Sequence, residues 1–187
     1  MKKLLLTVIA VIAIASTASA QTSSEPKNII GIWPGRLGNG IRIKYERTLS
    51  EKFTIGGTLT GYYGVFPGFQ VAPAGRFYFK PNAPEGFYVQ GKVLIGFYSQ
   101  NSNSKSVVDG NLYTDDKTSF TRFGGGVAVG YQLLWGKTDR WSLDLNIGVK
   151  YHGQNPTFGD GEVDNGKWGL FGPGSIVDGL ASIGYRF

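Results

Sequence analysis

Residues 140–152, RWSLDLNIGVKYH, alternate between apolar and polar side chains without interruption. The odd positions are all apolar, whereas the even positions are polar or glycine. A period of two predicts a β-strand with one apolar face and one polar face. Strands usually contain about five or six residues, so a run of this length indicates a fold built from long strands whose two faces meet different environments.

The same alternation recurs along most of the chain, in the segments 35–48, 53–64, 68–80, 86–100, 118–136 and 174–187. A weaker segment from Lys27 to Trp33, ended by a turn at Pro34-Gly35, is the expected eighth strand, because both chain ends should lie on one side of the sheet. The 29 glycines disfavour helices, since glycine costs about 1 kcal/mol per helical position. We predict an all-β fold, a closed antiparallel up-and-down transmembrane β-barrel of about eight strands.

The predicted connections differ in length on the two sides of the sheet. Short ones fall at 49–52, 81–85 and 136–139, and the other side carries a tight turn near 65–67 and long polar loops at 101–117 and 153–173. Short turns on one side and longer loops on the other are typical of outer-membrane barrels.

Alternation alone leaves open which face meets water, because a soluble barrel with an apolar interior has the same pattern. Four predicted apolar faces carry aromatic residues ten positions apart: Phe53 and Tyr63, Phe69 and Phe79, Phe87 and Phe97, Trp141 and Tyr151. Ten residues of a tilted strand rise roughly 25 Å, the height of the apolar band between the aromatic girdles of membrane barrels. This spacing favours a transmembrane barrel over a soluble one.

The N-terminus has the features of a secretory signal. Lys2 and Lys3 precede an apolar stretch from Leu4 to Ala15, and the small residues Ala18-Ser19-Ala20 follow as a cleavage site. We therefore predict a cleaved signal peptide at 1–20 and a barrel domain at 21–187. Removing the two lysines lowers the formal charge from +6 to +4, and the remaining basic residues are scattered, so no nucleic-acid partner is expected.

The polar faces of the predicted strands carry more basic than acidic residues. The side chains expected to point into the barrel are Arg42, Lys44, Glu46, Arg76, Lys80, Lys92, Arg122, Asp144, Lys150, Asp178 and Arg186. The interior of an eight-stranded barrel is just wide enough to be filled by side chains. We therefore expect a network of ion pairs and hydrogen bonds there. The excess of basic residues leaves open a narrow anion-conducting or ligand-binding lumen.

His152 is the only histidine, and Ser142, Asp144 and Asp178 share its predicted face. A lipid A-modifying hydrolase would need a histidine beside a serine and a carboxylate. However, no nucleophile is adjacent to His152 in sequence, and an inward histidine would not reach an acyl chain outside the barrel. We expect no catalytic residue and no enzymatic activity, with a lipid A-modifying enzyme as the alternative.

Chemistry that needs a metal or another cofactor is not expected. The chain contains no cysteine, which excludes disulfides and thiolate metal sites. The acidic stretch 159–168 has oxygen ligands at alternate positions, Asp160, Glu162 and Asp164. Counted from Asp160, the sixth position is Asn165 rather than glycine and the twelfth is Phe171 rather than glutamate, so the EF-hand pattern is not met.

The chain resembles a family through an ordered set of segments: YERTLSEKFTIG at 45–56, GRFYF at 75–79, GFYVQGKVLIGFYS at 86–99 and FGGGVAVGYQLLWG at 123–136. These look like the small Bacteroidetes outer-membrane β-barrel family of unknown function DUF3575. The ending ASIGYRF resembles the terminal strand of bacterial outer-membrane proteins, whose last aromatic residue is read by the barrel-assembly machinery. The resemblance implies that Tyr185 and Phe187 form this assembly signal, and it implies no catalytic residue.

These inferences predict an integral protein of the outer membrane of a Gram-negative bacterium. Its expected role is structural or surface-interacting within the cell envelope. The expected partners are outer-membrane lipid, the barrel-assembly machinery during biogenesis, and an extracellular partner bound through loops 101–117 and 153–173.

Overall fold

The computed structural model describes residues 27–36, 40–63, 66–100, 106–108, 111–113, 118–153 and 173–187. Every regular element in this part of the chain is a β-strand. No helix among these residues has the length and apolar character needed to cross a bilayer. The predicted signal peptide at 1–20 lies outside the described residues.

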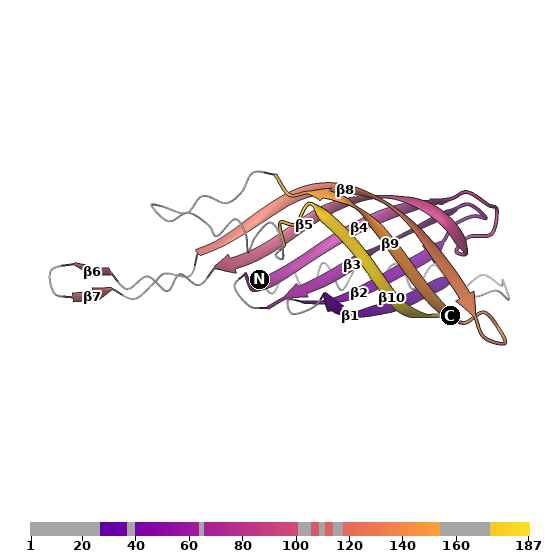
Figure 1. Cartoon of the computed structure of the whole chain (residues 1–187), viewed down its shortest axis with the longest axis horizontal. Helices are drawn as coiled ribbons and strands as arrows, with labels where there is room; N and C mark the ends of the chain where they lie inside the picture. The colour runs from indigo at the N-terminus through magenta and orange to yellow at the C-terminus, as the bar shows by residue number, and fades with distance from the viewer. Residues whose placement is uncertain are drawn as a thin grey trace.

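Eight strands form a closed barrel in the order β1-β10-β9-β8-β5-β4-β3-β2. Each pairs with its neighbours in an antiparallel manner (Figure 1). The strands are β1 (Asn28–Arg36), β2 (Gly40–Thr48), β3 (Phe53–Tyr62), β4 (Gly68–Tyr78), β5 (Gly86–Gln100), β8 (Thr118–Trp135), β9 (Trp141–Tyr151) and β10 (Val177–Arg186). This arrangement confirms the predicted closed all-β barrel and its strand number.

The barrel closes where the first and last strands meet. Ile29 pairs with Arg186 in the β1–β10 ladder. Beyond the ladder, Asn28 N–H donates to the Phe187 carbonyl at 3.0 Å, and Phe187 N–H donates to the Asn28 carbonyl at 2.8 Å. Both strand ends therefore lie at the end of the barrel that carries the short turns, called the short-turn end below, and the opposite end is called the long-loop end.

The prediction of a turn at Pro34-Gly35 is wrong. β1 continues through both residues to Arg36, which pairs with Gly40 of β2, and the register shifts between Trp33 and Arg36. Proline has no backbone N–H to donate, so a strand accommodates it where the ladder is irregular. The break that the sequence indicates is therefore an irregularity within a longer strand.

The region between β5 and β8, which was predicted only as a polar loop, contains two short strands. β6 (Ser106–Val108) and β7 (Asn111–Tyr113) pair with each other as a separate two-stranded sheet. Three residues per strand are too few for alternation to be recognised in the sequence. Most of the predicted loop at 153–173 lies outside the described residues.

The two faces of the barrel wall have opposite chemistry. Along β9, Ile147 and Val149 point outward and are 64% and 53% exposed, whereas Asp144 points inward and is fully buried. The outward side chains of the other barrel strands are also mostly apolar and exposed, and the buried set includes ten aliphatic or aromatic residues against sixteen polar or charged ones. The polar faces of the strands therefore enclose the lumen.

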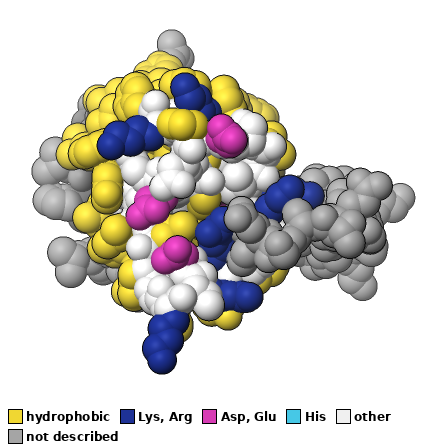
Figure 2. Space-filling model, turned by 90° about the vertical axis from the view of Figure 1, so that its right-hand side faces the viewer, with side chains coloured by type: hydrophobic (Ala, Val, Ile, Leu, Met, Phe, Trp, Pro, Cys, Tyr) yellow, Lys and Arg dark blue, Asp and Glu magenta, His cyan; other side chains and the backbone are white. Residues whose placement is uncertain are grey.

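Aromatic rings gather on the outer wall near the short-turn end. Phe87 packs against Tyr131 with ring centroids 4.7 Å apart, and Trp141 packs against Tyr185 at 5.6 Å. Seen from this end, hydrophobic side chains surround the charged and polar groups (Figure 2). The four members of the predicted aromatic pairs Phe53–Tyr63 and Trp141–Tyr151 lie on the exposed outer face, as the alternation of these strands predicts.

Close packing of β8 against β9 predicts a strong effect at Gly148. A Cβ atom there would lie 2.6 Å from both Cα and Cβ of Ala128. We expect Gly148→Ala to lower the free energy of unfolding by about 1–3 kcal/mol, the usual cost of overpacking. Gly91→Ala is the matched control, because a Cβ on this outward glycine would meet no atom within 4 Å. Equal urea midpoints for the two variants would contradict this packing.

Candidate functional site

Among the described residues, most buried polar side chains of the lumen gather in three groups along the barrel. The first, the Glu46–Asp144 cluster, consists of Lys44, Glu46, Arg76 and Asp144 near the short-turn end. The second, the Asp178 cluster, consists of Arg42, Lys92, Lys150 and Asp178. The third, the Gln70 group, consists of Tyr62, Gln70, Tyr98 and His152 near the long-loop end.

Charges are balanced in the Glu46–Asp144 cluster. Lys44 Nζ lies 2.8 Å from Glu46 Oε2 and 2.6 Å from Asp144 Oδ2. Arg76 contacts the same two carboxylates, at 3.0 and 2.8 Å. All four side chains are at most 6% exposed. Two cations and two carboxylates thus neutralise one another in the interior, the arrangement that buried charges require.

Neutral side chains complete the hydrogen bonding of this cluster. Tyr78 Oη donates to Glu46 at 2.9 Å, and Tyr88 Oη donates to Asp144 at 2.5 Å. The Tyr88 ring also lies 4.3 Å below the Arg76 guanidinium, a cation–π distance. Arg76 Nε donates to Gln90 at 2.7 Å. The cluster is therefore a connected polar core that links several strands.

The Asp178 cluster carries more positive than negative charge. Asp178 lies 3.5 Å from Arg42 Nη2 and 3.8 Å from Lys150 Nζ, and Lys92 Nζ is hydrogen-bonded to it. Arg42 also donates to the Thr60 hydroxyl at 3.0 Å. Among the described residues, three cations thus surround one carboxylate.

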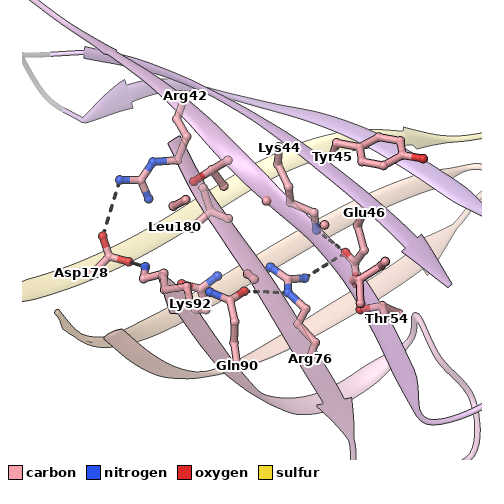
Figure 3. A pocket seen from close by; sticks show the side chains of 17 residues that line it. Arg42, Lys44, Tyr45, Glu46, Thr54, Arg76, Gln90, Lys92, Asp178 and Leu180 are labelled. Atoms are coloured by element: carbon pink, nitrogen blue, oxygen red, sulfur yellow. Dashed lines mark hydrogen bonds and ion pairs between the residues drawn. The ribbon is translucent and has the colours of Figure 1, made fainter. Parts of the chain in front are cut away.

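A cavity of about 20 Å³ lies between these two clusters. Arg42 and Lys92 border it from one cluster, and Lys44, Glu46 and Arg76 border it from the other (Figure 3). Gln90 and Asn146 also line it, and the small residues Gly56, Gly57, Ala72 and Ala74 contribute to its wall.

The Gln70 group fills the lumen toward the long-loop end. Gln70 Oε1 accepts from Tyr62 Oη at 3.3 Å and from Tyr98 Oη at 3.1 Å, and lies 3.0 Å from His152 Nε2. Phe66 packs with the two tyrosines in an apolar cluster. The side chain of His152 therefore sits inside the barrel, in contact with an amide.

His152 is remote from the serine considered as a nucleophile. Ser142 occupies the opposite end of β9, ten residues away, which corresponds to about 33 Å along a strand. Asp144 is bonded to Lys44, Arg76 and Tyr88. The described residues thus do not bring His152, Ser142 and Asp144 together, as a hydrolase would require.

Most residues predicted for the lumen network lie in the two charged clusters: Arg42, Lys44, Glu46, Arg76, Lys92, Asp144, Lys150 and Asp178. Arg122 is half-buried on β8 and lies 5.5 Å from the Phe120 ring centroid. Arg186 is half-buried at the end of β10.

Lys80 does not lie in the lumen. β4 ends at Tyr78, so Lys80 falls in the following turn, where its side chain is exposed. The inward and outward alternation holds only while the backbone remains pleated, and the predicted strand was two residues too long.

Sequence reasoning missed the neutral members of the network, chiefly Gln70, Tyr78, Tyr88, Gln90 and Gln132. Lys44 Nζ and Arg76 Nη1 both donate to Gln132 Oε1, at 2.7 and 3.0 Å. These residues share the inward positions of the charged ones, so the alternation itself indicated them. A tyrosine on a predicted lumen face needs a hydrogen-bond partner for its hydroxyl, and this was the available signal.

Comparison with known proteins gives one positive finding. A family model described as "Protein of unknown function (DUF3575)" matches residues 7–158. No curated protein and no solved structure shows a significant match.

Charge balance in the Glu46–Asp144 cluster predicts a large effect of Asp144→Asn. The substitution keeps the side-chain shape but leaves Lys44 and Arg76 facing one carboxylate. Removing one partner of a buried ion pair typically costs about 3–5 kcal/mol, and we expect this loss in urea unfolding.

Asp139→Asn is the matched control, because Asp139 is exposed in a turn with a φ of 49°, which asparagine tolerates. The double variant Asp144→Asn with Lys44→Met removes one charge of each sign and should recover part of the loss. If Asp144→Asn and Asp139→Asn were equally stable, the charge balance assigned to the Glu46–Asp144 cluster would be refuted.

Proposed function

The chain belongs to the DUF3575 family, and we propose that it is an integral β-barrel protein of a Gram-negative outer membrane with a structural or surface-interaction role. In this proposal residues 1–20 are a signal peptide that is removed on export. The barrel spans the membrane with its short-turn end in the periplasm. Loops 101–117 and 153–173 then face the outside, where they meet an extracellular partner.

The observation that carries the proposal is the exposed apolar outer wall around a charged interior. Outward residues of β9 and β8 such as Ile147, Val127 and Phe123 are 64%, 62% and 66% exposed. A monomer in water rarely leaves a large continuous apolar surface uncovered. A bilayer core solvates such a wall, while the buried charges of the lumen remain paired with one another.

The aromatic residues of the outer wall support a membrane position. Phe87, Trp141 and Tyr185 lie near the short-turn end, and Phe69, Phe123 and Tyr151 lie toward the long-loop end. Aromatic rings at both ends of an apolar band are typical of membrane barrels, where they occupy the headgroup regions. The terminal residue Phe187 is 50% exposed at the short-turn end, a position compatible with recognition by the barrel-assembly machinery.

The filled lumen supports a structural role rather than transport. Tyr78, Tyr88, Gln70 and Gln132 are at most 2% exposed, and the charged clusters occupy the space between them. Network side chains from facing strands meet across the interior, as in the contact between Arg76 of β4 and Asp144 of β9. Surface display through the long loops is then the activity proposed for the protein.

Membrane fractionation of cells that express the full chain tests location and export together. We expect the protein in the outer-membrane fraction, a mature N-terminus at Gln21, and a band that migrates faster on a gel without boiling than after it. Such heat-modifiability reports a folded barrel. A periplasmic protein without a band shift would instead favour the soluble alternative.

If the outer wall is buried in lipid, the destabilisation caused by a charged side chain on it should depend on the depth of that side chain in the bilayer. Ile147→Lys, in the middle of β9, should lower the free energy of unfolding by about 2–4 kcal/mol in lipid. Leu49→Lys is the matched control, because Leu49 is similarly exposed but lies just beyond β2 in a short turn, and its cost should be at most about 1 kcal/mol. Similar small losses at both positions would contradict a membrane-spanning wall.

The filled lumen predicts an electrically silent protein. Purified barrel in a planar bilayer should give no conductance steps, since Lys44, Glu46, Arg76 and Asp144 occupy its cross-section. The double variant Glu46→Ser with Arg76→Ser removes one charge of each sign and much side-chain volume, so it should conduct. Anion-selective steps from the unmodified protein would instead support the conducting alternative.

A further inference from the structure

The seam between β1 and β10 is paired over only part of its length. Toward the long-loop end, the last ladder pair of the seam joins Ile32 to Ile183. β10 nevertheless goes on pairing with β9 as far as Val177. Among the described residues, no ladder pair joins 179–182 of β10 to β1. Figure 1 shows the two strands together near the C-terminus and apart toward the long-loop end, so this half of the seam is held differently from the rest of the wall.

The hydrogen-bond pattern shows which backbone groups face the unpaired part of the seam. Asn28 and Phe187 exchange both of their backbone hydrogen bonds across the seam. Because such pairs alternate along an antiparallel ladder, the odd-numbered residues of β10 direct their N–H and C=O groups toward β1. The even-numbered Arg186 instead donates its N–H, at 2.7 Å, to the residue just before β9. Gly179 and Ala181 therefore direct their backbone groups into the unpaired part of the seam.

A proline explains why the ladder stops there. In the same register, the next hydrogen-bonded pair of the seam would join residue 34 to Ala181. Residue 34 is a proline, which has no N–H to donate. The pairing of β1 with β2 also becomes irregular here, between Trp33 and Arg36. Pro34 thus cannot supply the donor that the Ala181 carbonyl would need for the ladder to continue.

The side chain of Arg42 bridges this part of the seam from inside the barrel. Arg42 belongs to β2, which neighbours β1 on the side away from β10. Its Nη1 donates to the Gly179 carbonyl at 3.2 Å, and its Nη2 lies 3.5 Å from Asp178 on the same strand (Figure 3). The guanidinium also lies 5.3 Å from the ring centroid of Trp33 on β1, and Nε donates to Thr60 on β3 at 3.0 Å. One buried side chain therefore ties β10 to three neighbouring strands where the ladder pairs of the seam end.

We infer that the long-loop half of the β1–β10 seam is a lateral gate in the barrel wall, which Arg42 holds closed in place of ladder pairs. Opening the gate breaks the contacts of one side chain, whereas opening the wall between β5 and β8 breaks a continuous run of ladder pairs. The open gate connects the lumen beside Asp178 with the apolar outer wall at Ile32 and Ile183, which are 50% and 53% exposed. The inference concerns the barrel alone and does not depend on the proposed role in the outer membrane.

Amide hydrogen exchange resolved by residue is the first test, and it needs no variant. The full chain is expressed, and exchange is followed by NMR on the barrel purified from membranes. Ile183 and Tyr185 lie on the same edge of β10 and are paired with β1, so they are the internal reference. We expect the amides of Gly179 and Ala181 to exchange faster than these two by about tenfold or more, because a gate opens locally while the barrel stays folded. Equal protection of all four amides would overturn the inference.

Pro34→Ala is the variant that should close the gate, because alanine supplies the N–H that proline lacks. We expect exchange at Ala181 to slow by about tenfold, toward the rate of Ile183. Pro73→Ala is the matched control, because Pro73 lies within a strand, β4, that is not part of the seam. It should leave exchange at Ala181 unchanged. Exchange at Ala181 that is equally fast in folded Pro34→Ala and in the unmodified protein would contradict a seam held open by the missing donor.

Arg42→Met tests the side chain that holds the gate closed. Exchange should then accelerate by about tenfold at Ile183, the last paired residue beside the gate. Lys92→Met is the matched control, because it removes another cation bonded to Asp178 and should leave exchange at Ile183 unchanged. The same acceleration in both variants would refute the role of Arg42, and the first two measurements decide the question if Arg42→Met does not fold. None of these rates bears on heat-modifiability in the outer-membrane fraction, so the gate and the proposed function are tested separately.

Discussion

The structure of this barrel depends on ion pairs that cross its lumen. Arg76 of β4 bonds to Asp144 of β9 at 2.8 Å, although two strands, β5 and β8, separate them in the sheet. Lys44 of β2 reaches the same carboxylate at 2.6 Å. Such contacts exist only when the sheet is closed, because an open sheet would hold these side chains far apart. Closure therefore neutralises the charges that the alternation directs inward, and those charges in turn favour closure.

The same constraint explains why the outer wall is apolar. Because the polar face of every barrel strand lines the lumen, the opposite face must meet the surroundings. That outer face carries residues such as Ile147 and Phe123, which are 64% and 66% exposed. The pairing of β1 with β10 gives every barrel strand a partner on both sides, so the closed sheet has no free edge strand. A wall of this kind suits a bilayer, which is the setting proposed for it.

The sequence allowed most of the fold to be predicted, because strand alternation is a local signal. All eight barrel strands were found to within a few residues. The errors occurred where the pleat is short or irregular. Pro34-Gly35 was interpreted as a turn although β1 continues to Arg36, and β6 and β7 contain only three residues each. Lys80 was assigned to the lumen because the predicted strand ran past its end at Tyr78.

For the candidate site, the sequence by itself determined which face each residue occupies, since the side-chain direction in a strand depends only on position along the pleat. It did not determine which residues meet. Lys44 and Asp144 are 100 positions apart, and Arg76 and Gln90 are 14 apart, yet both pairs are in direct contact. The stagger of the closed barrel sets these distances. Only the tertiary structure could therefore decide that one cluster is neutral, that the other is positive, and that a cavity lies between them.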